Sequence, residues 1–443
     1  MRVALVSLGC AKNLVDSENM LGLLEQAGYE IVEDAGSADV VIVNTCAFIE
    51  PAVAESIEAL LDLADVKGGG GRTLVCAGCL TQRYGKALGD QLPEVDAFVG
   101  PGSAGEIVEA VRRASAGERP FIADAPPYLP SADTPRWRSG SEWSACVKVS
   151  DGCDHRCSYC LIPGLRGPHR SRPAHDIRAE CAGLVAQGVK EICLIAQDTS
   201  AYGRDLEPKA SLAELLGELG LEGFEGWVRL QYLHPVGVTD ELIEVVARTL
   251  AVVPYFDIPL QHADRDILRS MRRPGDAESY LKLLERIRGA IPDAALRTTF
   301  IVGYPGETRR KFDRLLQFVR QAQFDRLAVF PYWDEEGADS AALPGKVALE
   351  EARERLDELM SVQEDISLAR NQGFVGRRLR VLIEAQSGDG GGMVGRSYRD
   401  APEVDGQVLV DVGEAAEPVV PGQFVQVAVT RALEHDLAGE IVG

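Results

Sequence analysis

The sequence has few basic side chains and no long apolar run. Lys and Arg together number 46 against 68 Asp and Glu, which gives a formal net charge of −22. A chain this acidic repels phosphate backbones at long range, which disfavours a general nucleic-acid binder and favours a basic partner. No stretch reaches about 18 consecutive apolar residues, so we expect no transmembrane helix. The first ten residues, MRVALVSLGC, lack a long apolar region with a cleavage site and are interpreted as a strand of a cytoplasmic protein.

Three domains are expected from the length of 443 residues, at roughly 150 residues per domain, and no repeat of fixed period is present. Residues 1–140 alternate short apolar runs with helical patterns, which predicts an α/β domain with a doubly wound parallel sheet. Its expected strands are Val3–Leu8, Val40–Val43, Leu74–Ala77 and Val95–Val99. Helices are expected over Asp16–Ala27 and from about residue 52 to 63, and a flexible break is expected at Gly68–Gly71.

A second series of strands and helices is expected over residues 144–372, after a segment at 115–143 that has no periodicity, is rich in proline and is interpreted as a linker. Six strand–helix units would form a partial (β/α)6 version of the TIM barrel. The expected strands are Cys146–Val149, Ile192–Ala196, Val228–Gln231, Tyr255–Ile258, Leu296–Val302 and Leu327–Phe330. One long helix is expected over Val347–Gln372.

The last region, residues 373–443, changes to short Val-rich runs separated by Gly-rich turns. This pattern predicts a small β-barrel. The expected strands are Arg378–Ile383, Gln407–Val412 and Gln423–Val429. The region has six Lys and Arg against eleven Asp and Glu, so it lacks the basic composition expected of an RNA-binding barrel.

Three of the ten cysteines form one tight group, Cys153, Cys157 and Cys160, in the sequence DGCDHRCSYC. In a cytosolic enzyme such a group indicates a metal site more often than disulfides. Three thiolates on one loop after a strand suit an iron–sulfur cube in which one iron keeps an open position for chemistry. The alternative is a zinc site that takes a fourth ligand from His155 or His169.

Three further cysteines, Cys10, Cys46 and Cys79, each follow a predicted parallel strand within a few residues. Because the carboxyl ends of such strands share one edge of the sheet, we expect these three thiols to converge in space. They could equally be buried free thiols, since free cysteine is among the most buried residue types. The remaining cysteines are expected in the core: Cys76, Cys146, Cys181 and Cys193.

The loop CxxxCxxC after the first strand of a partial barrel resembles the radical SAM superfamily. This resemblance implies a 4Fe-4S cluster on Cys153, Cys157 and Cys160 whose open iron binds S-adenosylmethionine, with Tyr159 near the adenine. The segments SLGCAKN, VNTCAF and CAGCLTQRY are similar to the N-terminal domain of the methylthiotransferases within that superfamily. This second resemblance implies another 4Fe-4S cluster on Cys10, Cys46 and Cys79.

Within the methylthiotransferases, several motifs resemble the branch that modifies the β-carbon of an aspartate in the twelfth protein of the small ribosomal subunit. They are Ser7–Glu18, Leu92–Gly100, Gln197–Tyr202, Asp257–Met271, Arg297–Thr308 and, in a last domain that resembles a TRAM domain, Asp400–Gly406. The resemblance implies that ribosomal protein as substrate, a reductant protein as electron donor and a sulfur donor. A tRNA adenosine methylthiotransferase and a non-catalytic iron–sulfur carrier or scaffold remain alternatives.

Other candidate cofactor-binding residues follow from their places beside the barrel strands. Gln197 and Asp198 follow the second strand, at the edge where barrel active sites form. Arg297 and Gly303 flank the fifth strand, and a glycine there permits close backbone approach to a ligand or ends the strand. Two departures from the family pattern are Trp333-Asp334, which replaces a serine-containing run, and Asp151, which replaces a glutamate. The sequence assigns no catalytic side chain and no lining of the substrate pocket.

Overall fold

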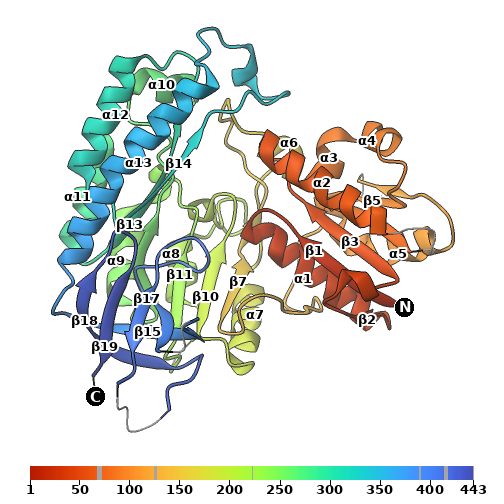
Figure 1. Cartoon of the computed structure of the whole chain (residues 1–443), viewed down its shortest axis with the longest axis horizontal. Helices are drawn as coiled ribbons and strands as arrows, with labels where there is room; N and C mark the ends of the chain where they lie inside the picture. The colour runs from red at the N-terminus through yellow and green to blue at the C-terminus, as the bar shows by residue number, and fades with distance from the viewer. Residues whose placement is uncertain (67–71, 124–126, 222, 389–390, 414–417, 443) are drawn as a thin grey trace.

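The computed structural model describes residues 1–66, 72–123, 127–221, 223–388, 391–413 and 418–442. Figure 1 shows an N-terminal α/β unit, a central sheet covered by helices, and a small barrel beside the far end of that sheet. The break expected at Gly68–Gly71 lies outside the described residues. No helix among the described residues is both long enough and apolar enough to span a bilayer.

The N-terminal unit is a six-stranded parallel sheet in the order β2-β1-β3-β4-β5-β6. Its strands are β1 (Arg2–Ser7), β2 (Glu30–Ile31), β3 (Val40–Thr45), β4 (Thr73–Gly78), β5 (Ala97–Val99) and β6 (Phe121–Ile122). Its helices are α1 (Ala11–Gln26), α2 (Glu50–Val66), α3 (Cys79–Tyr84), α4 (Lys86–Gln91) and α5 (Ile107–Ser115). α1 and α5 pack on one face of the sheet and α2, α3 and α4 on the other, which confirms the doubly wound prediction. β3 and β4 are buried throughout, as central strands covered on both faces must be.

The segment interpreted as a linker, residues 115–143, is in part regular and packs against both units that it connects. β6 adds to the sheet edge beside β5. Arg136 forms ion pairs with Glu18 of α1 (2.5 Å) and Glu180 (2.8 Å). Gly22 of α1 lies so close to Pro135 that a Cβ would sit 2.3 Å from the Pro135 carbonyl oxygen. Such contacts depend on residues far away in the sequence, so they leave no local periodicity.

The central unit is an open, all-parallel six-stranded sheet in the order β7-β10-β11-β12-β13-β14, which confirms the partial barrel. Its strands are β7 (Ser144–Lys148), β10 (Glu191–Ile195), β11 (Trp227–Leu230), β12 (Val252–Asp257), β13 (Ala295–Val302) and β14 (Arg326–Pro331). Its helices are α6 (Ile162–Arg166), α7 (Ala174–Ala186), α8 (Leu212–Gly217), α9 (Asp240–Arg248), α10 (Arg265–Ser270), α11 (Ala277–Ala290), α12 (Arg309–Ala322) and α13 (Leu349–Gln372). A short ribbon of β8 (Ser150–Asp151) and β9 (Arg170–Ser171) flanks the cysteine loop. α1 of the N-terminal unit lies beside β7, as Figure 1 also shows.

The C-terminal unit is a closed five-stranded barrel in the order β15-β16-β17-β19-β18. Its strands are β15 (Arg378–Gln386), β16 (Met393–Ser397), β17 (Val408–Asp411), β18 (Phe424–Ala432) and β19 (Leu437–Ile441). The small barrel was predicted correctly, although β16 and β19 were not. Alternate residues of β18, such as Val425, Val427 and Val429, point into its core.

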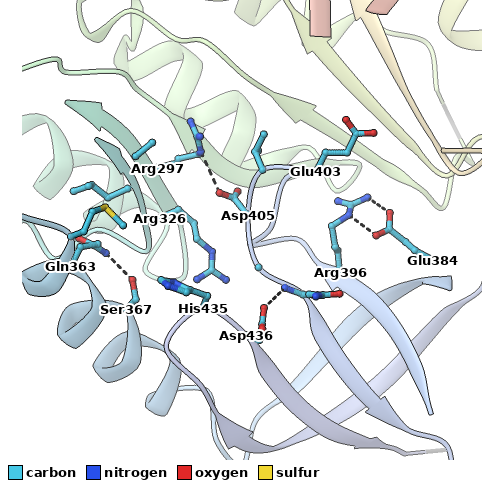
Figure 2. Close-up of a pocket in the computed structure, with 16 residues that line it drawn as sticks. Arg297, Arg326, Gln363, Ser367, Glu384, Arg396, Glu403, Asp405, His435 and Asp436 are labelled. Carbon is cyan, nitrogen blue, oxygen red and sulfur yellow. Dashed lines mark hydrogen bonds and ion pairs between the residues drawn. The ribbon is translucent and has the colours of Figure 1, made fainter. Parts of the chain in front are cut away.

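The C-terminal barrel docks at the amino-terminal ends of β13 and β14, where Arg297 and Arg326 line a pocket together with residues of the barrel (Figure 2). A cavity of about 610 Å³ lies at this junction, and no cysteine lines it. Arg297 of β13 bonds to Asp405 there (3.3 Å), and Arg396 of β16 pairs with Glu384. The site chemistry therefore belongs to the opposite end of the central sheet.

Candidate active site

The three N-terminal cysteines lie together at the carboxyl edge of the first sheet. Cys10 caps α1 just after β1, Cys46 follows β3, and Cys79 begins α3 directly after β4. Gly9 has a positive φ of +92°, and a Cβ on it would lie 3.1 Å from the Cys46 Sγ, so glycine permits this close approach. The hydroxyl of Ser56 fixes Cys46 by accepting from its backbone N–H (3.1 Å) and donating to its carbonyl (2.8 Å).

Burial and neighbouring charges together set the acidity of these thiols. Burial raises the pKa of Cys46, and it raises the pKa of Cys79 to about 11 although Arg166 opposes it. Burial also opposes ionisation of Cys10, but Lys12 and Arg166 lower the pKa of this thiol below its usual value. The thiols influence one another electrostatically, as groups gathered at one point do. Cation binding here would release protons, because metal ligands must be thiolates.

The second group, Cys153, Cys157 and Cys160, lies on the loop that follows β7 and β8. The loop is pinned at both ends. Gly152 (φ +81°) packs against the backbone of Pro168, where a Cβ would lie 2.0 Å from the carbonyl oxygen. Ser158 donates its backbone N–H to Met271 O (3.1 Å) and shares a 2.8 Å hydrogen bond with the Tyr304 hydroxyl.

Burial dominates the electrostatics of this loop. It raises the pKa of Cys153 to about 11 and that of Cys160 to about 12. Tyr159 packs among Ile267, Met271 and Tyr304, and burial raises the pKa of its hydroxyl well above the usual value. The Arg273 guanidinium lies 3.8 Å from Cys157 Sγ, so a cation faces the loop from the segment that follows α10.

The spacing of the sulfurs decides between a cube and a single metal ion. All ten cysteines are free. Among the described residues, only one group of three His, Cys, Asp or Glu brings its ligand atoms within 4.8 Å of one another, and neither cysteine triad is that group. Tetrahedral zinc, with bonds of about 2.3 Å, would hold its sulfurs roughly 4 Å apart. A cluster with one thiolate on each of several irons tolerates the wider spacing.

The group that does meet the 4.8 Å spacing is His155, Asp198 and His234. His155 Nε2 lies 2.7 Å from Asp198 Oδ2, and its ring stacks on His234 with centroids 4.1 Å apart. Burial opposes ionisation of Asp198, but hydrogen bonds from His155 and Ser200 lower its pKa to about 2. His155 is thus held by Asp198 and His234, and it lines the same cavity as Cys153. His169, the other candidate ligand, faces Ser171 and Asp205.

A buried ionic network joins the two cysteine groups, and sequence analysis missed it. Arg166 of α6 pairs with Asp16 of α1 (2.7 Å) and with Asp151 (3.2 Å), and Lys148 of β7 pairs with the same two aspartates. Arg166 also donates to Asn13 Oδ1 (2.6 Å). Two cations and two anions balance, and each is at least nine-tenths buried. The one sign of this network in the sequence was Asp151, which replaces the glutamate of the family pattern.

The other predicted cofactor-binding residues have different surroundings. Gln197 donates to Asp151 Oδ1 (2.6 Å), so Gln197 and Asp198 both lie beside the cysteine loop. Arg297 instead forms ion pairs with Asp257 (3.0 Å) and Asp405 at the C-terminal junction. Gly303 (φ +75°) faces α13, where a Cβ would lie 2.4 Å from the Ala352 Cβ. In the structure, Arg297 and Gly303 therefore contact other residues of the same chain.

Three family matches cover most of the chain. Residues 2–100 match the uncharacterized protein family UPF0004, residues 147–319 the radical SAM superfamily, and residues 375–442 the TRAM domain. The radical SAM match contains the cysteine loop and four of the six central strands in full, β10 to β13.

Solved structures share the fold. The radical S-adenosylmethionine methyltransferase TsrM from Kitasatospora setae aligns with a TM-score of 0.54 and 16% identity, over 74% of each chain. The cobalamin-dependent S-adenosylmethionine radical enzyme OxsB aligns with a TM-score of 0.52 and 12% identity, over 82% of this chain and 56% of that one. The fold and the cysteine loop thus define a radical SAM enzyme, a class that implies a 4Fe-4S cluster and S-adenosylmethionine.

Similarity to curated relatives identifies the family within the radical SAM enzymes. The chain is 46% identical to the ribosomal protein uS12 methylthiotransferase RimO of Synechococcus sp. (strain RCC307), over 100% of this chain and 90% of that protein. It is 46% identical to the RimO protein of Desulforudis audaxviator (strain MP104C), over 100% and 97% of the two chains. With the radical SAM match and this full-length similarity, the chain belongs to the RimO family of radical SAM methylthiotransferases.

Proposed function

We propose that this protein adds a methylthio group to the β-carbon of an aspartate in ribosomal protein uS12. The observation that carries the proposal is the meeting of two cysteine triads at one junction, linked by the buried network of Arg166, Lys148 and two aspartates. Full-length similarity to RimO proteins supports the reaction and the substrate. A carrier or scaffold would not need two separate triads held in fixed register.

In this proposal the work is divided among residues 1–140, 144–372 and 373–443. Cys153, Cys157 and Cys160 hold a 4Fe-4S cluster that has an open iron for S-adenosylmethionine. When bound, this pair supplies a 5′-deoxyadenosyl radical, which can break an unactivated C–H bond that acid–base side chains cannot break at neutral pH. Tyr159 of this loop packs against the buried side chains of Ile267, Met271 and Tyr304.

We assign a second 4Fe-4S cluster to Cys10, Cys46 and Cys79, as the site that carries the sulfur. The free thiols, their convergence and the cations Lys12 and Arg166 beside them support this assignment, because positive charge favours thiolates. A sulfur donor and a reductant protein would serve the two clusters.

The chain's own residues would orient the cofactor. Tyr159 sits inside the cysteine loop, where its ring can pack against the adenine. Gln197 is fixed through Asp151, and its buried Oε1 has no hydrogen-bond partner among the described residues, so it can accept from a bound ligand. Asp198 fixes His155, which belongs to the same loop. Tyr159, Gln197 and Asp198 are the cofactor contacts that we propose.

The charge of the C-terminal barrel favours a basic protein over tRNA. Of its few basic residues, Arg396 and Arg399 are buried at the junction with the central unit. Arg377 pairs with Asp293, and Arg380 donates to the Glu225 carbonyl. Among the described exposed residues of the barrel, Glu403, Asp411, Glu434 and Glu440 outnumber Arg377, Arg378 and Arg431 by one, and acids attract basic partners and repel phosphates.

The test is anaerobic incubation of the cluster-loaded protein with reductant, S-adenosylmethionine, sulfide and either purified uS12 or tRNA. We expect mass spectrometry to find one methylthio group on an aspartate of uS12, together with 5′-deoxyadenosine. Methylthioadenosine in tRNA with unmodified uS12 would contradict the substrate. Absence of 5′-deoxyadenosine in both mixtures would favour the carrier or scaffold.

A further inference from the structure

Lys12 is a buried cation at the junction of the two cysteine triads, and no carboxylate of the described residues pairs with it. It is only 7% exposed, and no carboxylate of the described residues lies within ion-pair distance of its Nζ. The other buried cations nearby have acceptors: Lys148 and Arg166 share two aspartates, and Arg273 donates to the Pro259 carbonyl (2.6 Å). Burial of an unpaired ammonium is costly, so such a group marks a place for an incoming anion.

The side chain of Lys12 is held in place by an aromatic ring of the central unit. Its Nζ lies 3.2 Å from the centroid of the Tyr232 ring. A cation–π contact stabilises the position of the ammonium and leaves its hydrogens free for another acceptor. The contact therefore positions the cation without neutralising it.

Tyr232 is itself a rigid and strained platform. Its φ of +62° is rare for a non-glycine residue. The strained backbone is fixed by two hydrogen bonds, from its N–H to Asp257 Oδ2 (2.9 Å) and from Thr199 N–H to its carbonyl (3.0 Å). Strain of this kind is retained where the surroundings enforce a functional geometry.

Lys12 lies between the two triads. On one side it is two residues from Cys10 and acts on the charge of that thiol. On the other side, Tyr232 is two residues from His234, whose ring stacks on His155 of the loop that carries Cys153 and Cys157. An anion bound to Lys12 would thus lie between the sulfur-carrying site and the radical-generating site.

We propose that Lys12 binds the side-chain carboxylate of the substrate aspartate. This inference rests on the proposed function and names the group that recognises its substrate. The carboxyl carbon is bonded directly to the β-carbon, so holding the carboxylate fixes the carbon that is modified. The same contact selects aspartate over asparagine, because a neutral amide cannot replace the charge of the carboxylate.

The experiment measures binding of two forms of uS12 to the anaerobic, cluster-loaded protein. One form carries the aspartate that is modified, and the other carries asparagine at that position. Truncating one partner of a buried charge pair commonly costs about 2–5 kcal/mol, so the native protein should prefer the aspartate form by at least about 30-fold in Kd. Lys12→Met should reduce the preference to near unity, whereas Lys12→Arg should keep most of it.

Lys86→Met is the matched control, because it removes the same charge from an exposed position on α4 of the same unit, and it should keep the full preference. The comparison of the two uS12 forms on the native protein needs no enzyme variant, so it remains decisive if Lys12→Met fails to fold. Equal binding of both forms by the native protein, or an unchanged preference in folded Lys12→Met, would overturn the assignment.

Mass spectrometry of the same mixtures separates this inference from the proposed function. Methylthio product without discrimination between the two forms would remove the role of Lys12 and leave the function standing. Discrimination that depends on Lys12, without any product, would support the role of Lys12 and contradict the proposed function. A change in iron content alone, with discrimination intact, would show that Lys12 serves only the neighbouring thiols.

Discussion

Replacing Arg166 by methionine should separate the two halves of the active site. Arg166 is 3% exposed in its side chain and pairs with Asp16 (2.7 Å) and Asp151 (3.2 Å). Without it, the two aspartates share only Lys148, and the balanced network carries one excess negative charge in a buried place. Breaking a buried pair by removing one partner costs about 3–5 kcal/mol. We expect a loss of this size in the contact between α1 and the central unit.

The control is Arg112→Met, which breaks a surface pair of similar geometry. Arg112 lies 2.7 Å from Glu109, but the two side chains are 64% and 44% exposed. Exposed pairs of this kind contribute about 0–1 kcal/mol. The same substitution in the same unit should therefore be nearly silent.

Hydrogen exchange of the amides of α1 is the appropriate assay, because a chain with several units need not unfold in one step. The double variant Arg166→Met with Asp16→Asn restores charge balance, since Lys148 then faces Asp151 alone. It should recover at least about 1 kcal/mol relative to the sum of the two single variants. Equal exchange in Arg166→Met and Arg112→Met would refute the reasoning.

Three further outcomes are expected. Replacing Cys153, Cys157 and Cys160 by alanine should abolish formation of 5′-deoxyadenosine but retain iron. Replacing Cys10, Cys46 and Cys79 should retain cleavage of S-adenosylmethionine and abolish sulfur insertion. A folded triple variant without any iron would contradict the assignment of two separate sites. Neutralising the exposed acids Asp411, Glu434 and Glu440 should slow the association of uS12 in stopped-flow mixing more than it slows turnover, and added salt should have the same effect. An association rate that responds to neither change would exclude electrostatic steering by these acids. Burial opposes ionisation of Glu191, Asp325 and Asp400, but arginine partners lower the pKa of each, so the stability they give is complete above the usual carboxyl pKa of about 4 and is lost below it. Fluorescence of Trp227, which packs on Phe424 of the C-terminal barrel at 4.8 Å, should report undocking in that acid range, and an unchanged signal at about pH 3 would argue against it.

The positions of the strands were readable from the sequence because strand periodicity is local. The strands expected at Val40–Val43 and Leu74–Ala77 are β3 and β4, and their carboxyl ends bring Cys46 and Cys79 to one edge. The same rule placed Gln197 and Asp198 beside the cysteine loop after β10.

Side-chain partners far apart in the sequence could not be foreseen. Arg166 and Asp16 are 150 positions apart, and no periodicity links them. Arg297 was expected at the active-site edge, but it is the third residue of the eight-residue β13, where it faces Asp405 of the C-terminal barrel. Asp405 itself is not an exposed acid that could steer a partner, since it also accepts from the Tyr255 hydroxyl (2.6 Å).

Buried ion pairs fix how the two triads lie relative to each other. The junction also has apolar contacts, in which Val15 of α1 packs against Cys193 and Ile195 of β10 and Leu165 of α6 packs into the N-terminal core. Apolar contacts tolerate sliding, whereas the Arg166 and Lys148 pairs hold only in one register, which is the best-attested use of buried ion pairs. A reaction that takes a hydrogen atom at one site and supplies sulfur from another requires a fixed distance between them. The cost of burying these four charges is therefore understandable as the means of fixing that distance.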